Sequence, residues 1–111
     1  MKKVNVLGTL YTIYFDVPDK KLPEGCDGCM DQSVHQIRIA KLESSRNSLR
    51  NLKEYKKKVL RHEIIHAFLY ESGLWNNSGD AENWGRNEEI TDWIAIQSPK
   101  LFKAFKEADC L

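Results

Sequence analysis

The hydrophobic and polar positions divide the chain into an N-terminal part with strand-like patterns and a C-terminal part with helical patterns. Residues 4–15 are rich in β-branched and aromatic side chains, and residues 34–40 alternate between apolar and polar types. Both segments are therefore predicted to be strands. The stretch 17–32 between them contains proline and glycine and is predicted to be a loop.

Helical spacing of apolar residues dominates from residue 44 onwards. A long helix is predicted to begin with a cap within residues 44–47 and to end near Gly73. After a loop around 76–80, residues 87–95 start with a capping residue and an acidic first turn, which predicts a second helix. The pair Ser98-Pro99 is predicted to start a last short helix that runs to about residue 109. The order of elements favours an α+β fold.

Length and charge restrict the class of protein. The chain has 111 residues and a formal net charge of +1, so we expect a single domain over 1–111 and no global attraction to nucleic acid. No apolar run is long enough to cross a bilayer. The first apolar segment is interrupted by Asn5, Thr9 and Thr12, which favours a strand over a signal peptide. A cytoplasmic location is the default expectation.

Three further features are predicted to have structural roles. Cys26 and Cys29 have the spacing of a metal knuckle or a redox pair, but the odd total of three cysteines favours free thiols in a loop and a reducing compartment. The basic run 53–58 is predicted to be a solvated helix face. The tryptophans are predicted to belong mainly to the core, with the lining of a substrate cleft as the alternative. They are Trp75, Trp84 and Trp93.

The segment 62–66, His-Glu-Ile-Ile-His, carries the strongest chemical signal. Four residues advance an α-helix by about 400° and about 6 Å, so His62 and His66 project from one face and can reach a single metal ion. Glu63 lies about 100° around the helix from His62, which suits a general base acting on a zinc-bound water better than a ligand. The alternative is a pair of partly buried helix histidines without a metal, but the apolar surroundings favour a ligand role.

A catalytic zinc site usually has three protein ligands, and the third one here is predicted to be a carboxylate. The only other histidine, His35, precedes the helix. Among the downstream acidic residues, Glu71 points away from the histidine pair, and Asp80 and Glu82 follow a turn-like sequence. The acidic residues after His66 are Glu71, Asp80, Glu82, Glu88, Glu89, Asp92, Glu107 and Asp109.

Glu88 is the best placed of these carboxylates. If the helix that starts at Asn87 packs antiparallel to the first one, Glu88 can face the two histidines. Asp92, one turn later, would then point to the same side and could accept the distal N–H of a ligand histidine. The predicted zinc ligands are therefore His62, His66 and Glu88, with Asp92 supporting a ligand from behind.

The two motifs, His62-Glu63-x-x-His66 and Asn87-Glu88-x-x-Thr91-Asp92, resemble the signature of gluzincin metallopeptidases such as the thermolysin-like enzymes. The short chain looks more like minimal gluzincins and the ImmA/IrrE-type peptidases of phages and mobile elements. The resemblance implies a zincin-like fold, with a small N-terminal sheet packed on a long active-site helix and a glutamate-bearing helix after it. It also implies that an edge strand, for which residues 34–40 are the candidate, binds an extended peptide.

The activity implied is zinc-dependent hydrolysis of peptide bonds, with Glu63 as general base. The implied partner is a peptide or protein substrate, for which a repressor of a mobile element is one candidate; the sequence does not indicate an oligomeric state. No histidine follows His66, so the stabiliser of the tetrahedral intermediate found in large thermolysins has no counterpart, and only Tyr70 or His35 could replace it. Two alternatives stay open: a zinc-binding interaction module without robust proteolysis, and a metal-free helical binding protein.

Overall fold

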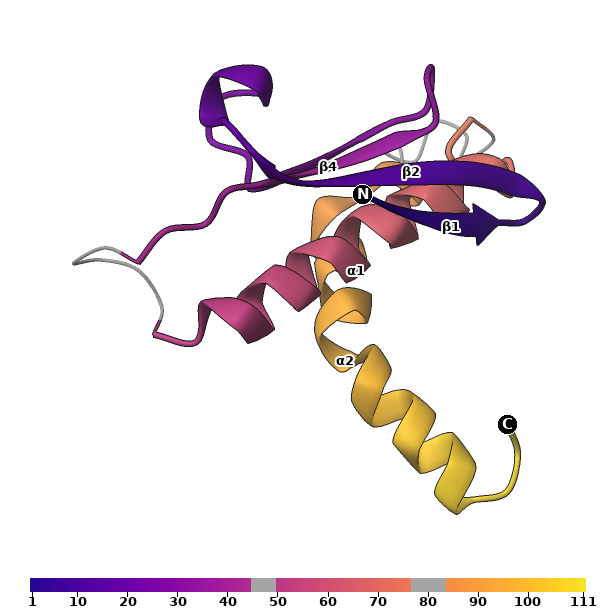
Figure 1. The fold of residues 1–111 in the computed structure, drawn as a ribbon. Coiled ribbons are helices and arrows are strands. Elements are labelled where there is room, and N and C mark those ends of the chain that lie inside the picture. Colours follow the sequence, from indigo (N-terminus) through magenta and orange to yellow (C-terminus); the bar gives the residue numbers. More distant parts are fainter. Residues whose placement is uncertain (45–49, 77–83) are drawn as a thin grey trace.

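The computed structural model describes residues 1–44, 50–76 and 84–111. A sheet of four strands packs against one long helix, and a second long helix crosses below it (Figure 1). The predicted α+β layout, with an N-terminal sheet on a long helix that is followed by a glutamate-bearing helix, is confirmed. The strands are β1 (Lys2–Val6), β2 (Thr9–Val17), β3 (Gly28–Asp31) and β4 (Gln36–Ala40), and the helices are α1 (Leu52–Glu71) and α2 (Glu88–Glu107), with short 3-10 turns at Asp19–Lys21 and Trp84–Arg86.

The N-terminal half contains more strands than the sequence predicts. The single strand expected over 4–15 is a hairpin of β1 and β2, because Leu7 and Gly8 both have positive φ angles and reverse the chain. The loop expected over 17–32 contains β3, whose residues Gly28-Cys29-Met30-Asp31 lack β-branched side chains. Pairing with β4, rather than local propensity, therefore makes this segment a strand.

Strand order places β1 and β3 at the two edges of the sheet. The order is β1-β2-β4-β3, with β4 parallel to β2 and antiparallel to β3. The prediction that residues 34–40 form an edge strand is therefore wrong, because β4 has a neighbour on each side. The edge strands open to a further strand are instead β1 and β3, and of these β3 is the one next to Glu63 of α1 at the candidate site.

One hydrophobic core joins the sheet to α1. Alternate residues of the two central strands point to the same face of the sheet and are buried: Tyr11 and Ile13 from β2, Ile37 and Ile39 from β4. Val59 and Ala67 of α1 close this core from the other side. The face of α1 that packs on the sheet thus fixes its rotation, and with it the direction of the side chains between Val59 and Ala67.

Both ends of α1 have recognisable caps. Asn51 accepts a hydrogen bond from the Glu54 backbone N–H at 3.2 Å, so the described helix begins at Leu52. Of the cap predicted within 44–47, residues 45–47 lie outside the described residues. At the other end Ser72 caps the helix and Gly73 takes a φ of 87°, as the predicted end near Gly73 requires.

Helix α2 is one continuous helix of 20 residues. The prediction that Ser98-Pro99 starts a separate helix is wrong, since Pro99 lies inside α2. Proline has no N–H for the carbonyl of Ala95, four residues earlier. Arg61 of α1 replaces that donor, because its Nε lies 2.5 Å from Ala95 O. In the described parts of the chain, no helix has the length and apolar character that crossing a membrane would need.

Candidate metal centre

His62 and His66 lie one turn apart on the face of α1 that turns towards α2. Their ring centroids are 4.7 Å apart in an edge-to-face arrangement. The side chains are largely buried, with 14% and 8% of their surface exposed. The helix register predicted from the sequence therefore brings both imidazoles to the same place.

Glu88, the first residue of α2, reaches both histidines with one carboxylate. Its Oε1 lies 2.7 Å from His66 Nε2 and its Oε2 lies 3.2 Å from His62 Nε2. Asn87 caps α2 by accepting a hydrogen bond from the Ile90 N–H at 2.9 Å, which fixes where the helix starts and so where Glu88 stands. One donor atom from each of these three residues lies within 4.8 Å of the others, an arrangement that could hold a metal ion.

Asp92 lies behind His62, on the side away from Glu88. The His62 Nδ1 atom is 3.1 Å from Asp92 Oδ1, and the same oxygen accepts a hydrogen bond from Lys58 Nζ at 3.0 Å. Burial acts to raise the pKa of Asp92, but the bonds from Lys58 and His62 outweigh it and lower this pKa below its ordinary value. Asp92 is therefore an ionised acceptor that holds a proton on His62 Nδ1 and leaves Nε2 free for a metal.

Glu63 lies in a confined space between α1 and the first residue of β3. Only 8% of its surface is exposed. A Cβ atom built on Gly28 would come within 3.1 Å of Glu63 Cγ and 3.2 Å of its Oε2, so the glycine makes room for this carboxylate. Burial raises the pKa of Glu63 to about 7, with the Glu88 carboxylate adding to the rise against the effect of His62. A carboxyl group with this pKa can exchange a proton near neutral pH.

His66 is the more deeply buried of the two histidines. Burial lowers its pKa below the ordinary value of 6.5, although the Glu88 carboxylate acts in the opposite direction. Trp75 packs edge-to-face on the ring, with centroids 5.8 Å apart. The Nδ1 atom of His66 is buried and has no hydrogen-bond partner within the described ranges. These surroundings keep the imidazole neutral, which is the state that binds metals.

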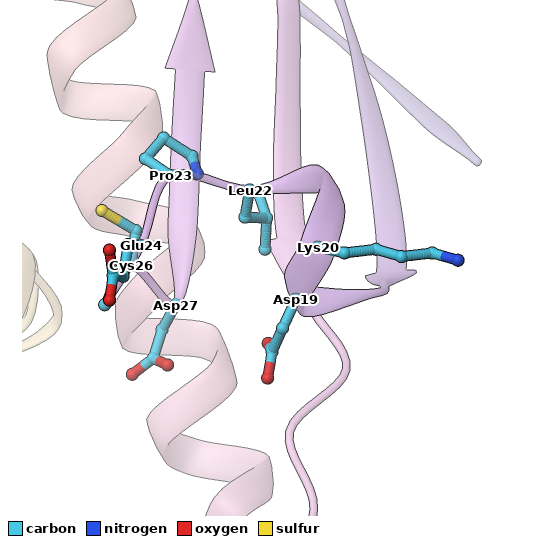
Figure 2. Close-up of a pocket in the computed structure, with 8 residues that line it drawn as sticks. Asp19, Lys20, Leu22, Pro23, Glu24, Cys26 and Asp27 are labelled. Atoms are coloured by element: carbon cyan, nitrogen blue, oxygen red, sulfur yellow. The ribbon is translucent and has the colours of Figure 1, made fainter.

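A pocket of about 250 Å³ opens onto His62 and Glu63. Glu88 and Asp92 form its wall on the α2 side, and the turn 25–28 before β3 forms the opposite wall. Residues 25–27 also line a second, larger pocket that opens in the loop between β2 and β3. Figure 2 shows this neighbouring pocket, with Asp19 and Asp27 pointing to the same side of the loop and Lys20 pointing away from it.

Two polar residues of the metal-site pocket were not identified from the sequence. Tyr55 donates a hydrogen bond to Asp27, and Lys58 binds Asp92; both side chains line the pocket. Lys58 lies one helical turn before His62, so spacing alone could have placed it on the same face. The basic character of 53–58 instead indicated a solvated helix face.

The two residues that could replace the missing stabiliser of the intermediate lie away from the pocket. Tyr70 packs against the core and against Trp75, with ring centroids 6.2 Å apart. His35 has a φ of 53° in the turn between β3 and β4 and packs on Tyr11. Neither side chain lines the pocket with Glu63.

Among the described residues, the other acidic side chains that follow His66 do not join the cluster. Glu71 accepts hydrogen bonds from Thr9 and Tyr11 of β2, at 2.8 and 2.7 Å. Asp80 and Glu82 lie outside the described residues. Within the described ranges, the group that could hold a metal consists of His62, His66 and Glu88.

The cysteines and tryptophans differ in how well their predictions hold. Cys26, Cys29 and Cys110 are free thiols, as expected. Trp75 is half-buried against His66, whereas Trp84 and Trp93 are 49% and 56% exposed, so the prediction of a core position is wrong for these two. Neither of them lines the pocket with His62 and Glu63.

Comparison with known proteins adds no family to this description. No family model, no curated protein and no solved structure matches the chain.

Proposed function

We propose that this protein is a zinc-dependent metallopeptidase of the gluzincin type. The observation that carries the proposal is the position of the Glu88 carboxylate, 2.7 and 3.2 Å from the Nε2 atoms of His66 and His62. His62 and Glu88 are 26 residues apart in the sequence, and they converge on one point in space. A pair of structural histidines would not require this convergence.

The donor set fits zinc. Two imidazole nitrogens and one carboxylate are a ligand set of catalytic zinc sites, which keep a further position open. Both histidine nitrogens are supported for this role, His62 by Asp92 and His66 by a burial that keeps it neutral. The Glu88 side chain is 73% exposed, so the side of the cluster that faces the pocket is accessible to a substrate.

When bound, zinc would acidify a water molecule and polarise the carbonyl group of a peptide bond. Glu63 takes the proton of the attacking water, because its carboxylate lines the same pocket and its pKa of about 7 allows both states at neutral pH. Glu63 then donates this proton to the departing amine. Lys58 supplies a hydrogen-bond donor in the pocket wall, where a carbonyl oxygen of the substrate can be bound, because its ammonium group has N–H donors beyond the one that Asp92 accepts.

The substrate in this proposal is an extended peptide that pairs with β3. This strand forms one edge of the sheet, and its first residue, Gly28, adjoins Glu63. An added strand would satisfy the free hydrogen-bonding groups of β3 and lay the peptide across the pocket. A protein segment, for which a repressor of a mobile element is one candidate, fits this mode of binding.

The test uses the zinc-loaded protein, an unbiased peptide library and Glu63→Gln. We expect cleavage by the wild type and a loss of at least about a hundredfold in the variant, with zinc retained. Glu54→Gln, which changes an exposed glutamate in the first turn of the same helix, is the control and should cleave like the wild type. Zinc binding without any cleavage would instead leave a metal-binding module, and equal cleavage by Glu63→Gln would reject the role of Glu63.

A further inference from the structure

The two histidines of the candidate metal centre are held in different ways. His62 has the Asp92 carboxylate 3.1 Å from its Nδ1 atom. The Nδ1 atom of His66 is buried and has no hydrogen-bond partner among the residues that the structure describes. Histidines that bind a metal almost always donate this second ring N–H to an acceptor, which fixes the direction of the ring. The direction of the His66 ring is therefore set by packing.

Trp75 supplies that packing. The ring centroids of Trp75 and His66 lie 5.8 Å apart and the ring planes meet at 78°, which is the geometry of an edge-to-face pair. The place of Trp75 follows from the end of α1. Gly73 has a φ of 87°, and beyond it the Trp75 N–H donates to the Leu69 carbonyl oxygen at 3.0 Å. The indole therefore folds back over the last turns of the helix, where it also packs edge-to-face on Tyr70.

Arg86 holds Trp75 through two contacts. Its Nε donates a hydrogen bond to the Trp75 carbonyl oxygen at 3.2 Å, and its guanidinium carbon lies 5.1 Å from the centre of the Trp75 ring. A planar guanidinium suits both contacts, as a hydrogen-bond donor and as a cation on an aromatic face. Arg86 directly precedes Asn87, the cap of α2, and lies two residues before Glu88. The residue that holds the packing partner of one ligand is therefore close in sequence to another ligand.

Gly85 allows the short 3-10 turn before α2 to lie directly on the end of α1. The glycine is buried, and a Cβ atom built on it would come within 2.6 Å of the Leu74 carbonyl oxygen. Such a close approach to backbone requires a residue without a side chain. The start of α2 is thus fixed against the segment that carries Trp75 by this backbone contact as well as by Arg86.

We propose that Trp75 and Arg86 are positioning residues for the metal ligands of the two helices. Trp75 keeps the His66 ring directed at the metal site through packing. Arg86 ties the indole to the start of α2 and so holds Glu88 opposite this ring. The inference rests on the metal site of the proposed function. Neither Trp75 nor Arg86 lines the metal-site pocket, so neither is assigned a contact with the substrate.

Metal affinity tests the inference without any turnover. Trp75→Leu removes the ring but keeps an apolar side chain, and Arg86→Met keeps a long side chain but removes its donors and charge. We expect each change to weaken zinc binding by about 10–100-fold, as the loss of a group that orients a ligand does, measured by competition with a chromogenic chelator. Trp93→Leu and Arg50→Met are the matched controls, because both residues are exposed. They should bind zinc within about threefold of the wild type.

Conservative variants separate positioning from general stability. Trp75→Phe keeps an aromatic edge beside His66 and should recover most of the affinity that Trp75→Leu loses. Arg86→Lys keeps the charge but not the planar fork, so it should recover only part. Urea unfolding shows that each metal-free variant is folded under the conditions of the titration, where a loss of stability alone leaves the affinity of the folded chain unchanged. Arg86 is exposed, so Arg86→Met tests the inference even if Trp75→Leu does not fold.

A protein whose single tryptophan is Trp75, made by Trp84→Phe and Trp93→Phe, shows whether the metal binds beside this ring. Co²⁺ takes the same nitrogen and oxygen donors as zinc and quenches indole fluorescence at short range. We expect the emission to fall as Co²⁺ is added and to level off at about one ion per chain. The same protein with Glu88→Ala should need much more Co²⁺ for the same quenching.

The outcomes distinguish this inference from the proposed function. No binding of zinc or Co²⁺ to the wild type would reject the metal site itself, and the inference with it. One bound metal that quenches Trp75, together with wild-type zinc affinity in Trp75→Leu and Arg86→Met, would keep the metal site and reject the positioning role. Zinc binding by Trp75→Phe that is as weak as that of Trp75→Leu would reject orientation of His66 by an aromatic edge.

Discussion

Arg61 Nε donates a hydrogen bond to the carbonyl oxygen of Ala95 across the contact between α1 and α2. The bond has a specific cause, since Pro99 removes the N–H that would otherwise serve this carbonyl within the helix. It also has a consequence for the candidate site. Arg61 precedes His62, and Ala95 lies two turns after Glu88, so the bond fixes the two helices against each other where the histidines and the carboxylate meet.

Replacing Arg61 should therefore lower the free energy of unfolding more in the wild type than in a chain without Pro99. Arg61→Met leaves the Ala95 carbonyl without its donor and should lower the free energy of unfolding by about 1–3 kcal/mol. In a Pro99→Ala background the helix supplies its own N–H, so the same change should cost less. Urea unfolding of the four proteins measures the coupling, and equal costs in both backgrounds would contradict the assigned partnership.

Glu63 should make the metal-free protein less stable as the pH rises. Its pKa is raised from 4.5 to about 7 in the folded chain, so the folded state holds the proton more tightly than the unfolded state does. This tighter proton binding stabilises the folded state fully below pH 4.5. The stabilisation, up to about 3 kcal/mol, is lost as the pH rises through about 7. Glu63→Gln should remove this loss, and the metal-free variant should be more stable than the wild type at pH 8. Thermal unfolding of both proteins in the presence of a chelator, across this pH range, tests the prediction. If the stability of the wild type and of Glu63→Gln changed with pH in the same way, Glu63 would not be buried as described.

Glu71 should produce the opposite pH dependence. Its hydrogen bond from Tyr11 lowers the pKa of Glu71 below 4.5, with the Thr9 hydroxyl acting in the same direction. The stabilisation is present above pH 4.5 and is lost as the pH falls through the lowered pKa. Tyr11→Phe should cost about 1 kcal/mol at pH 7 and should flatten the acid side of the stability curve. Tyr14→Phe, in the same strand, is the control, and the account fails if both variants have the same acid profile.

Asp92 should tune the metal affinity through His62. Asp92→Asn keeps the size of the side chain but removes the ionised acceptor at 3.1 Å from His62 Nδ1. We expect metal affinity to fall by about 10–100-fold while the fold is retained. Competition with a chromogenic chelator measures this change. An affinity equal to that of the wild type would assign Asp92 to the contact with Lys58 alone.

The parts of the site that could be predicted from sequence are those set by helix register. The spacing of His62 and His66 decides that both face one way, and the Asn87 cap decides where Glu88 and Asp92 stand. The parts that could not be predicted depend on distant partners. Gly28–Asp31 forms a strand only because β4 pairs with it. Helix α2 continues past Pro99 with its Ala95 carbonyl satisfied, because Arg61 of α1 supplies the hydrogen-bond donor that the proline lacks. Local patterns contain neither relationship.

The central claim is that Glu88 completes a zinc site with the two histidines. Elemental analysis of purified, metal-replete protein measures it most directly, in the wild type, Glu88→Ala and Glu89→Ala. The last variant removes the neighbouring exposed glutamate, which no metal cluster among the described residues includes. We predict about one zinc per chain for a single site in the wild type and in Glu89→Ala, and a much lower content in Glu88→Ala. No zinc in the wild type, or equal zinc in all three proteins, would contradict the account.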